Sequence, residues 1–152
     1  MIRTDKRLRL CSVLLVCTLI FIWGNSLLPG DISGELSDGV QEILEKLFGP
    51  SPEDTPSGIP LRKLAHFGEY AVLGGLLFWY LGMMGKRKRM AICVGAMVAC
   101  VDETIQIFVP GRGPGIRDVC IDCGGVAAGM IFTFLGYIYF QRKRNKESME
   151  DM

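Results

Sequence analysis

Carboxylates inside an apolar stretch are the first feature of this sequence that could do chemistry. Asp102 and Glu103 interrupt a run of residues that otherwise has the composition of a membrane-spanning helix. A carboxylate in hydrocarbon costs about 2.5–3.5 kcal/mol on insertion scales, so such residues usually face the interior of a helix bundle and have a partner there. Intramembrane ionisable groups mark functional sites by default, although carboxylates in a water-filled opening could serve only the folding of the bundle.

A second polar group precedes these carboxylates and contains the only histidine of the chain. Lys63, His66, Glu69 and Tyr70 lie at offsets of 0, 3, 6 and 7 residues, which places them on one face of a helix. A lone histidine is more often a structural residue than a ligand or base. Here Glu69 lies one helical turn deeper in the membrane, which makes a functional role of His66 as plausible as a structural one. Gln106 lies one turn beyond Asp102 and marks the side of the next helix that we expect to face inward.

The third polar group follows a helix-ending proline. Arg112 lies in a glycine-rich turn after Pro110, and we expect its side chain to fold back over the carboxylates. Asp118 and Asp122 begin the next apolar stretch, on the same stripe as Gly125-x-x-x-Gly129. Small residues at this spacing let another helix approach closely.

These residue types support acid–base chemistry or cation binding. Carboxylates held together near a histidine or arginine can supply a general acid and a general base, and a carboxylate-rich site could instead hold a divalent cation. An arginine can grip a phosphate or carboxylate with two hydrogen bonds. We expect catalytic roles for His66, Glu69, Asp102, Glu103 and Asp118, and substrate-binding roles for Lys63, Gln106, Arg112 and Asp122.

Cys120 and Cys123 form a C-x-x-C whose surroundings favour packing over redox or zinc chemistry.

Four apolar blocks must position these groups. The chain has 152 residues, 49% of them hydrophobic, and each block approaches the length of about 20 residues needed to cross a bilayer. The sequence therefore predicts one all-α integral membrane domain over 10–140, with four transmembrane helices and one short external amphipathic helix. The predicted spans cover about 10–29, 64–85, 90–109 and 119–140.

The distribution of basic residues predicts the orientation. Twelve of the 17 Lys and Arg residues lie in three places, which are residues 1–9, the connection at 86–89 and the tail at 141–152. The positive-inside rule makes these segments cytoplasmic, so we expect a multi-pass protein of the cell membrane with both termini inside. The three polar groups then converge near the outer surface.

The long external connection, residues 30–62, contains one apolar stripe at helical spacing. We expect an amphipathic helix over about 35–48, capped by Ser33 and ended by Gly49-Pro50, with a stiff proline-rich link after it. The helix could be a plain external element or a lid over the polar site.

The order of these motifs resembles the VanZ-like family. The resemblance covers about 15–140 and rests on Lys63-x-x-His66-x-x-Glu69-Tyr70, Asp102-Glu103-x-x-Gln106, and Pro110-Gly111-Arg112 followed by Asp118. Gly113, Pro114 and Gly115 replace the small hydroxyl residues usual in the family, and Asp122 stands where Asn is common. The resemblance implies a cell-envelope role and, for the namesake, low-level resistance to teicoplanin, a glycopeptide that acts on cell-wall precursors outside the membrane.

Two functions remain open at this point. The polar site could bind a lipid head group, a cell-wall precursor or the glycopeptide, or it could belong to a hydrolase or transferase that uses activated water on a lipid-linked or phosphate-bearing substrate. Whether the protein is an enzyme is undecided by the sequence. The expected partners are the lipid bilayer and these envelope molecules, with no nucleic acid, and a divalent cation is a conceivable cofactor. Ion movement is less favoured, because the inner halves of the spans carry no polar path.

Overall fold

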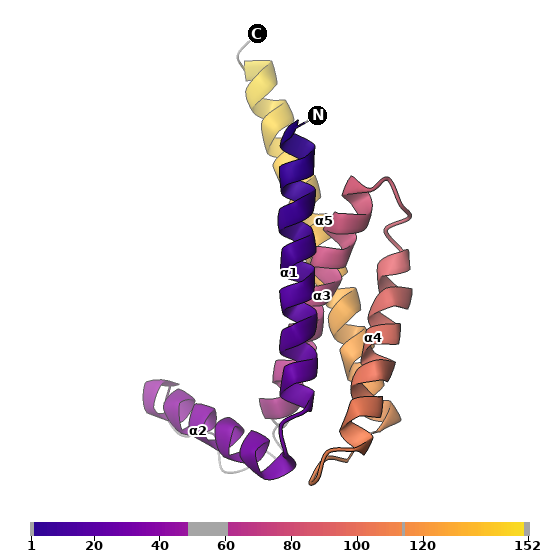
Figure 1. Ribbon diagram of the computed structural model, residues 1–152. Helices are drawn as coiled ribbons and strands as arrows, with labels where there is room; N and C mark the ends of the chain where they lie inside the picture. Colours follow the sequence, from indigo (N-terminus) through magenta and orange to yellow (C-terminus); the bar gives the residue numbers. More distant parts are fainter. Residues whose placement is uncertain (1, 49–60, 114, 151–152) are drawn as a thin grey trace.

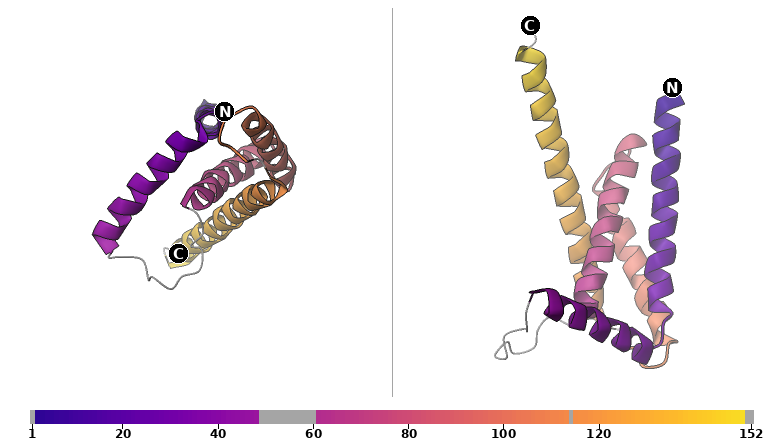
Figure 2. Two further views of the ribbon diagram at one scale, coloured as in Figure 1. Left: turned by 90° about the horizontal axis from the view of Figure 1, so that it is seen from below. Right: turned by 90° about the vertical axis from the view of Figure 1, so that its left-hand side faces the viewer.

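The computed structural model describes residues 2–48, 61–113 and 115–150, and these residues contain helices and no strands. The proline-rich link expected at 50–60 lies outside the described residues. The five helices are α1 (Ile2–Ser26), α2 (Gly30–Phe48), α3 (Leu61–Met83), α4 (Met90–Ile107) and α5 (Ile116–Glu150). Helices α1, α3, α4 and α5 run side by side as a bundle, and α2 projects sideways from the foot of α1 at one end of it (Figures 1 and 2). We call this the α2 end; both termini lie at the other end (Figure 1).

Helix α2 begins five residues earlier than the sequence predicts, at Gly30. The Ser33 amide donates to the Pro29 carbonyl at 3.0 Å, so Ser33 lies inside the first turn and its expected position before the helix is wrong. Proline favours a helix start, because its ring fixes φ and its missing N–H would have no helical partner there. The apolar residues Leu36, Val40 and Ile43 remain 48–58% exposed, so the bundle does not cover this stripe.

Helices α3 and α5 make the most extensive contact of the bundle. Glycines permit it: a Cβ on Gly125 would collide with the Phe67 carbonyl oxygen, and one on Gly129 with the Ala71 carbonyl oxygen. The close approach predicted from Gly125-x-x-x-Gly129 is therefore confirmed. This contact brings the first turns of α5 against the first turns of α3.

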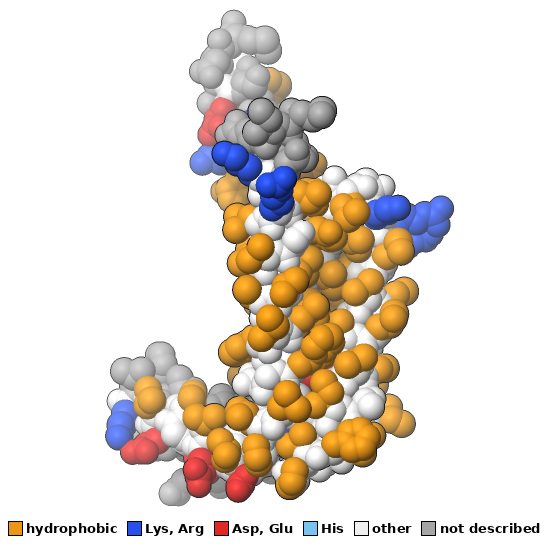
Figure 3. All heavy atoms as spheres, in the orientation of Figure 1, with side chains coloured by type: hydrophobic (Ala, Val, Ile, Leu, Met, Phe, Trp, Pro, Cys, Tyr) orange, Lys and Arg blue, Asp and Glu red, His pale blue; other side chains and the backbone are white. Residues whose placement is uncertain are grey.

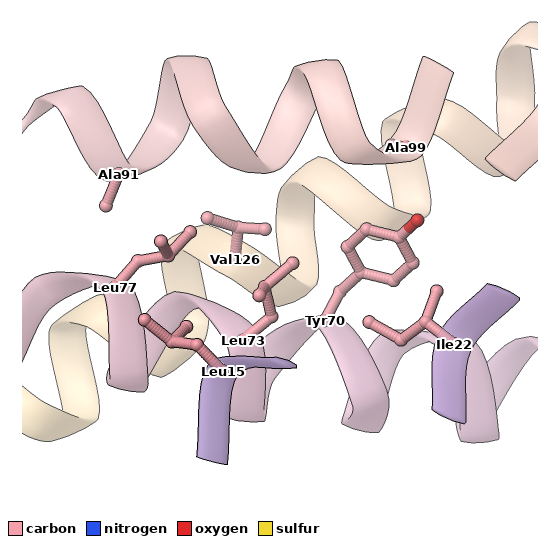
Figure 4. Close-up of a cluster of buried hydrophobic side chains, with 8 residues drawn as sticks. All are labelled: Leu15, Ile22, Tyr70, Leu73, Leu77, Ala91, Ala99 and Val126. Atoms are coloured by element: carbon pink, nitrogen blue, oxygen red, sulfur yellow. The ribbon is translucent and has the colours of Figure 1, made fainter. Parts of the chain in front are cut away.

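The apolar core runs along the inside of the bundle and joins all four long helices. Ile22 of α1, Tyr70 and Leu73 of α3, Ala99 of α4 and Val126 of α5 are fully buried (Figure 4). The Tyr70 ring extends from α3 toward α4, at the boundary between this core and the polar residues of the α2 end.

The face of the bundle shown in Figure 3 is largely apolar. Large side chains such as Ile20, Met97 and Phe132 are 66–73% exposed. Exposing so much apolar surface is unfavourable in water but not in the hydrocarbon of a membrane. Within the described residues, Lys6–Ser26, Met90–Ile107 and Ile116–Glu147 are long and apolar enough to cross a membrane. Helix α3 has comparable length but carries four polar side chains in its first nine residues, so its crossing stays a prediction.

Candidate functional site

The turn between α4 and α5 holds the α2 end together. The Gly30 amide donates to the Pro110 carbonyl at 3.0 Å, and the backbone of Gly30 lies directly against that of Gly111. A Cβ on Gly30 would collide with the Gly111 carbonyl, and Gly111 adopts a φ of +73°, which L side chains rarely adopt. The corner between α1 and α2 is thereby fixed over the polar ends of α3, α4 and α5.

His66 lies between two carboxylates that come from two other helices. Its Nδ1 is 3.9 Å from Asp102 Oδ2 on α4 and 3.9 Å from Asp122 Oδ1 on α5. The side chains of both aspartates are 0–1% exposed, and that of His66 is 14% exposed. These distances exceed hydrogen-bond length, so the three groups surround a common space.

A buried amide orients Asp102. Gln106 Nε2 donates to Asp102 Oδ2 at 3.2 Å and to the Ser26 hydroxyl of α1 at 3.3 Å. Gln106 is 1% exposed and therefore faces inward, on the side of α4 that the sequence assigns to it.

Glu103 is buried and Asp118 is partly exposed at the same end of the bundle. The Gly115 amide donates to Glu103 Oε2 at 2.8 Å, which ties the α4–α5 turn back to α4. Lys63 Nζ lies 3.5 Å from Asp118 Oδ1, with 42% and 25% of the two side chains exposed. Such a partly exposed pair contributes little to stability, roughly 0–1 kcal/mol.

A small cavity of about 20 Å³ lies among these groups, with room for about one water molecule. Its wall consists of Arg62, Lys63, His66, Glu103, Gln106, Asp118, Ile121 and Asp122. Six of the nine residues assigned to the site from the sequence thus meet here, and Asp102 adjoins them through His66 and Gln106.

Glu69 lies apart from the other carboxylates. Its Oε1 accepts a hydrogen bond from Asn25 Nδ2 at 2.7 Å, so the side chain faces α1 rather than α4 or α5. Glu69 and His66 border a larger cleft of about 450 Å³ between α1, α2 and α3. The polar wall of this cleft includes Asn25, Arg62 and Arg112, and its apolar wall includes Phe21, Leu36, Val40 and Leu64.

Arg112 makes different contacts from those expected. Its Nη2 donates to the Asn25 carbonyl at 2.7 Å and its Nε to the Leu28 carbonyl at 3.0 Å. Within the described chain it pairs with no carboxylate within 4.0 Å, so the expectation that it folds over the carboxylates is wrong. Carbonyls at and just beyond the end of α1 have no helical N–H four residues further on, and although the Leu28 amide also donates to the Asn25 carbonyl at 3.2 Å, they attract the guanidinium. Burial lowers the pKa of Arg112, which nevertheless stays charged as arginines do in proteins.

Three residues near the site were missed by sequence reasoning. Asn25 and Ser26 close the first apolar block and bind Glu69 and Gln106, and Arg62 borders both cavities. A polar pair at the end of an apolar block was the available signal for Asn25 and Ser26. For Arg62, the only signal in the sequence was its position next to Lys63.

The C-x-x-C pair takes no part in the site. All six cysteines are free; Cys120 is exposed and Cys123 partly buried. The packing expected for the pair therefore applies at most to Cys123.

The arrangement offers two chemical environments side by side. The space around His66, Asp102 and Asp122 is enclosed and lined by carboxyl oxygens, whereas the cleft beside Glu69 carries two arginines and apolar walls. The first suits a cation or a proton-transfer reaction, and the second suits an anionic head group attached to an apolar chain.

A family model described as VanZ/LLP1 matches residues 11–139 of the chain. No curated protein and no solved structure matches it. The matched region contains most of α1, all of α2, α3 and α4, and most of α5, together with every residue assigned to the site from the sequence. The chain therefore belongs to the VanZ-like family.

Proposed function

We propose that this protein binds an anionic amphiphile of the bacterial cell envelope, such as a lipid-linked phosphate precursor, at the extracytoplasmic face of the cell membrane. One observation carries the proposal: the cleft of about 450 Å³ between α1, α2 and α3 has a cationic end and apolar walls. A ligand with an acidic head group and a hydrocarbon chain matches both parts.

The polar end of the cleft has excess positive charge. Arg62 and Arg112 both border it, and the one carboxylate there, Glu69, already accepts a hydrogen bond from Asn25. Arg112 Nη1 is buried and has no hydrogen-bond partner among the described residues. A buried donor without a partner is uncommon, and a phosphate or carboxylate oxygen would supply one.

The apolar wall of the cleft supports a ligand that also contacts lipid. Leu36 and Val40 of α2 are 58% and 48% exposed, and Phe21 and Leu64 on the facing helices are 59% and 55% exposed. An acyl chain lying here would remove apolar surface from water at about 25 cal/mol per Å². Helix α2 would then act as one wall of a lateral entrance from the membrane, with its acidic face toward water.

The charge distribution favours an extracytoplasmic position for this cleft. The exposed basic residues Lys6, Arg87 and Lys143 belong to the segments near the termini and the α3–α4 turn, at the end opposite α2. If those segments are cytoplasmic, the α2 end reaches the leaflet where cell-wall precursors are used.

Mass spectrometry of co-purified lipids tests the proposal. We expect wild-type protein to retain an anionic amphiphile, and Arg62→Ala and Leu64→Trp to retain about tenfold less, the factor that corresponds to 1.4 kcal/mol. Arg87→Ala, at the opposite end, is the matched control and should behave as wild type. Equal retention by all four proteins, or no anionic amphiphile on wild type, would contradict the proposal.

Glycopeptide resistance is the cellular role that the family resemblance implies. Binding of a precursor or of teicoplanin itself at this cleft would alter how much antibiotic meets its target. Expression in a susceptible strain should raise the inhibitory concentration of teicoplanin, and Arg62→Ala should remove that rise while Arg87→Ala keeps it.

A second candidate is a membrane-embedded hydrolase or transferase. It is favoured by the placement of His66 between Asp102 and Asp122, with Glu103 bordering the adjoining cavity. Activated water would be the nucleophile. If Glu103→Gln increases the amount of bound amphiphile while wild type releases a cleaved product, the protein is an enzyme.

A further inference from the structure

We propose that His66, Asp102 and Asp122 are the protein ligands of a divalent transition-metal ion. One ligand atom from each residue lies within 4.8 Å of the other two, and the three residues come from α3, α4 and α5. The site adjoins the cleft beside Glu69, because His66 borders both, but Asp102 and Asp122 do not line the cleft, so metal binding does not require amphiphile binding there.

Asp122 provides the observation that points to a bound cation. Its side chain is 1% exposed, and neither carboxylate oxygen has a hydrogen-bond partner within the described part of the chain. A buried carboxylate without hydrogen bonds is strongly unfavourable, and native proteins pair such groups or use them to coordinate metals. The nearest cationic candidate, His66 Nδ1, is 3.9 Å from Asp122 Oδ1, too far to donate a hydrogen bond.

The separations fit metal coordination better than direct contact. Ligands held at about 2.0–2.2 Å from a tetrahedral ion lie roughly 3.3–3.6 Å apart. The two distances from His66 Nδ1, both 3.9 Å, are slightly longer than this. The largest separation within the group is at most 4.8 Å, so each ligand atom would have to move inward by roughly half an ångström or less to bind one ion.

The surroundings of the three residues also resemble a metal site. Gln106 Nε2 donates to Asp102 Oδ2 at 3.2 Å, which fixes the carboxylate as outer hydrogen bonds commonly do for ligands. The adjoining cavity of about 20 Å³ can hold one water as a further ligand. Two carboxylates balance the charge of a divalent ion, and Glu103 borders the space where the water would lie.

The donor set indicates the class of ion. One imidazole nitrogen and two carboxylate oxygens suit Zn²⁺, Mn²⁺ or Fe²⁺ better than the soft ions that thiolates select, and the imidazole disfavours Mg²⁺ and Ca²⁺. Three protein ligands leave coordination positions for water or substrate, as in catalytic sites rather than closed structural ones.

Metal binding to the purified full chain in nanodiscs tests the inference. After chelator treatment and dialysis against Zn²⁺ or Mn²⁺, elemental analysis should find one ion per wild-type chain. Asp122→Asn and His66→Gln should each lower the affinity at least about 100-fold, since even outer-sphere partners are worth 10–100-fold. Asp38→Asn is the control, an exposed carboxylate on α2 that is not part of the cavity wall, and should bind as wild type.

Thermal unfolding keeps the test decisive if a variant folds poorly. Added Zn²⁺ should raise the unfolding temperature of wild type and of Asp38→Asn but not of Asp122→Asn. Without metal, Asp122→Asn should be at least as stable as wild type, because it keeps the shape of the side chain and removes a buried acidic group that lacks a partner. If wild type binds less than one metal ion per chain, or if Asp122→Asn binds metal with wild-type affinity, the proposed metal site is wrong. Neither result would contradict the proposed amphiphile binding.

Discussion

Arg112 Nη2 donates a hydrogen bond to the main-chain carbonyl of Asn25 at 2.7 Å and thereby closes the C-terminal end of α1. The same guanidinium reaches the Leu28 carbonyl at 3.0 Å, so a residue from the α4–α5 turn caps a helix 84–87 positions earlier in the chain. Asn25 uses its own side chain for Glu69, so one corner of the bundle links α1, α3 and the turn. Arg112 is therefore a structural anchor that also borders the cleft.

Replacing Arg112 should lower the free energy of unfolding. Hydrogen bonds involving a charged group contribute about 1.5–3 kcal/mol, so we expect Arg112→Ala to cost about 2–4 kcal/mol. Arg112→Lys should recover only part of this, because an ammonium cannot present two fixed donors to the Asn25 and Leu28 carbonyls. Chemical unfolding in detergent measures both. The exposed Arg117 provides the control, and an equal loss in Arg117→Ala would show that charge alone matters.

Enlarging Gly129 should separate α3 from α5. The side chain of Gly129→Val would meet the Ala71 backbone, which cannot move aside as a flexible side chain can. Overpacking typically costs 1–3 kcal/mol, and we expect roughly 3 kcal/mol or more here. Gly136→Val, on the same helix with nothing within 4 Å of its Cβ position, should be close to neutral by the same thermal measurement. Similar losses in both variants would argue against the close crossing.

Asn25 and Glu69 should show energetic coupling. Asn25→Ala leaves Glu69 Oε1 without its 2.7 Å hydrogen bond, and Glu69 Oε2 already has no partner among the described residues. A buried acceptor left unpaired costs about 1–3 kcal/mol. Asn25→Ala combined with Glu69→Leu should cost less than the sum of the two single changes, with a coupling of roughly 1–2 kcal/mol in a double-mutant cycle. Additive effects would mean that the hydrogen bond does not stabilise the fold.

Thiol labelling of intact cells should report the orientation. In a background without native cysteines, Asp38→Cys on α2 should react with an impermeant reagent and Arg87→Cys in the α3–α4 turn should not. Both residues are exposed and lie at opposite ends of the bundle, so accessibility within the protein does not decide the result. The reverse pattern would place the candidate site in the cytoplasmic leaflet and end the proposed role with extracytoplasmic precursors.

Part of the polar site was predictable because helical spacing is a local property. Lys63 and His66 share a face of α3, Asp102 and Gln106 share a face of α4, and a carboxylate in an apolar run has strong physical reasons to turn inward. The structure buries Asp102, Glu103 and Gln106 accordingly. Glu69 was harder, because its position on α3 is close to two neighbouring helices and only packing decides which one it faces.

The sequence by itself determined the all-helical architecture, the family, the helix-forming blocks and a close helix approach at Gly125 and Gly129, because periodicity, composition and small-residue spacing act over one or two helical turns; that the approaching helix is α3 came from the structure. Only the tertiary structure decided which polar groups meet. His66 lies between Asp102 and Asp122, while Arg112 binds the end of α1 rather than a carboxylate. These contacts depend on how the helices are placed about the bundle axis and on a turn that crosses over α1, and neither is encoded by the spacing of residues within any one helix.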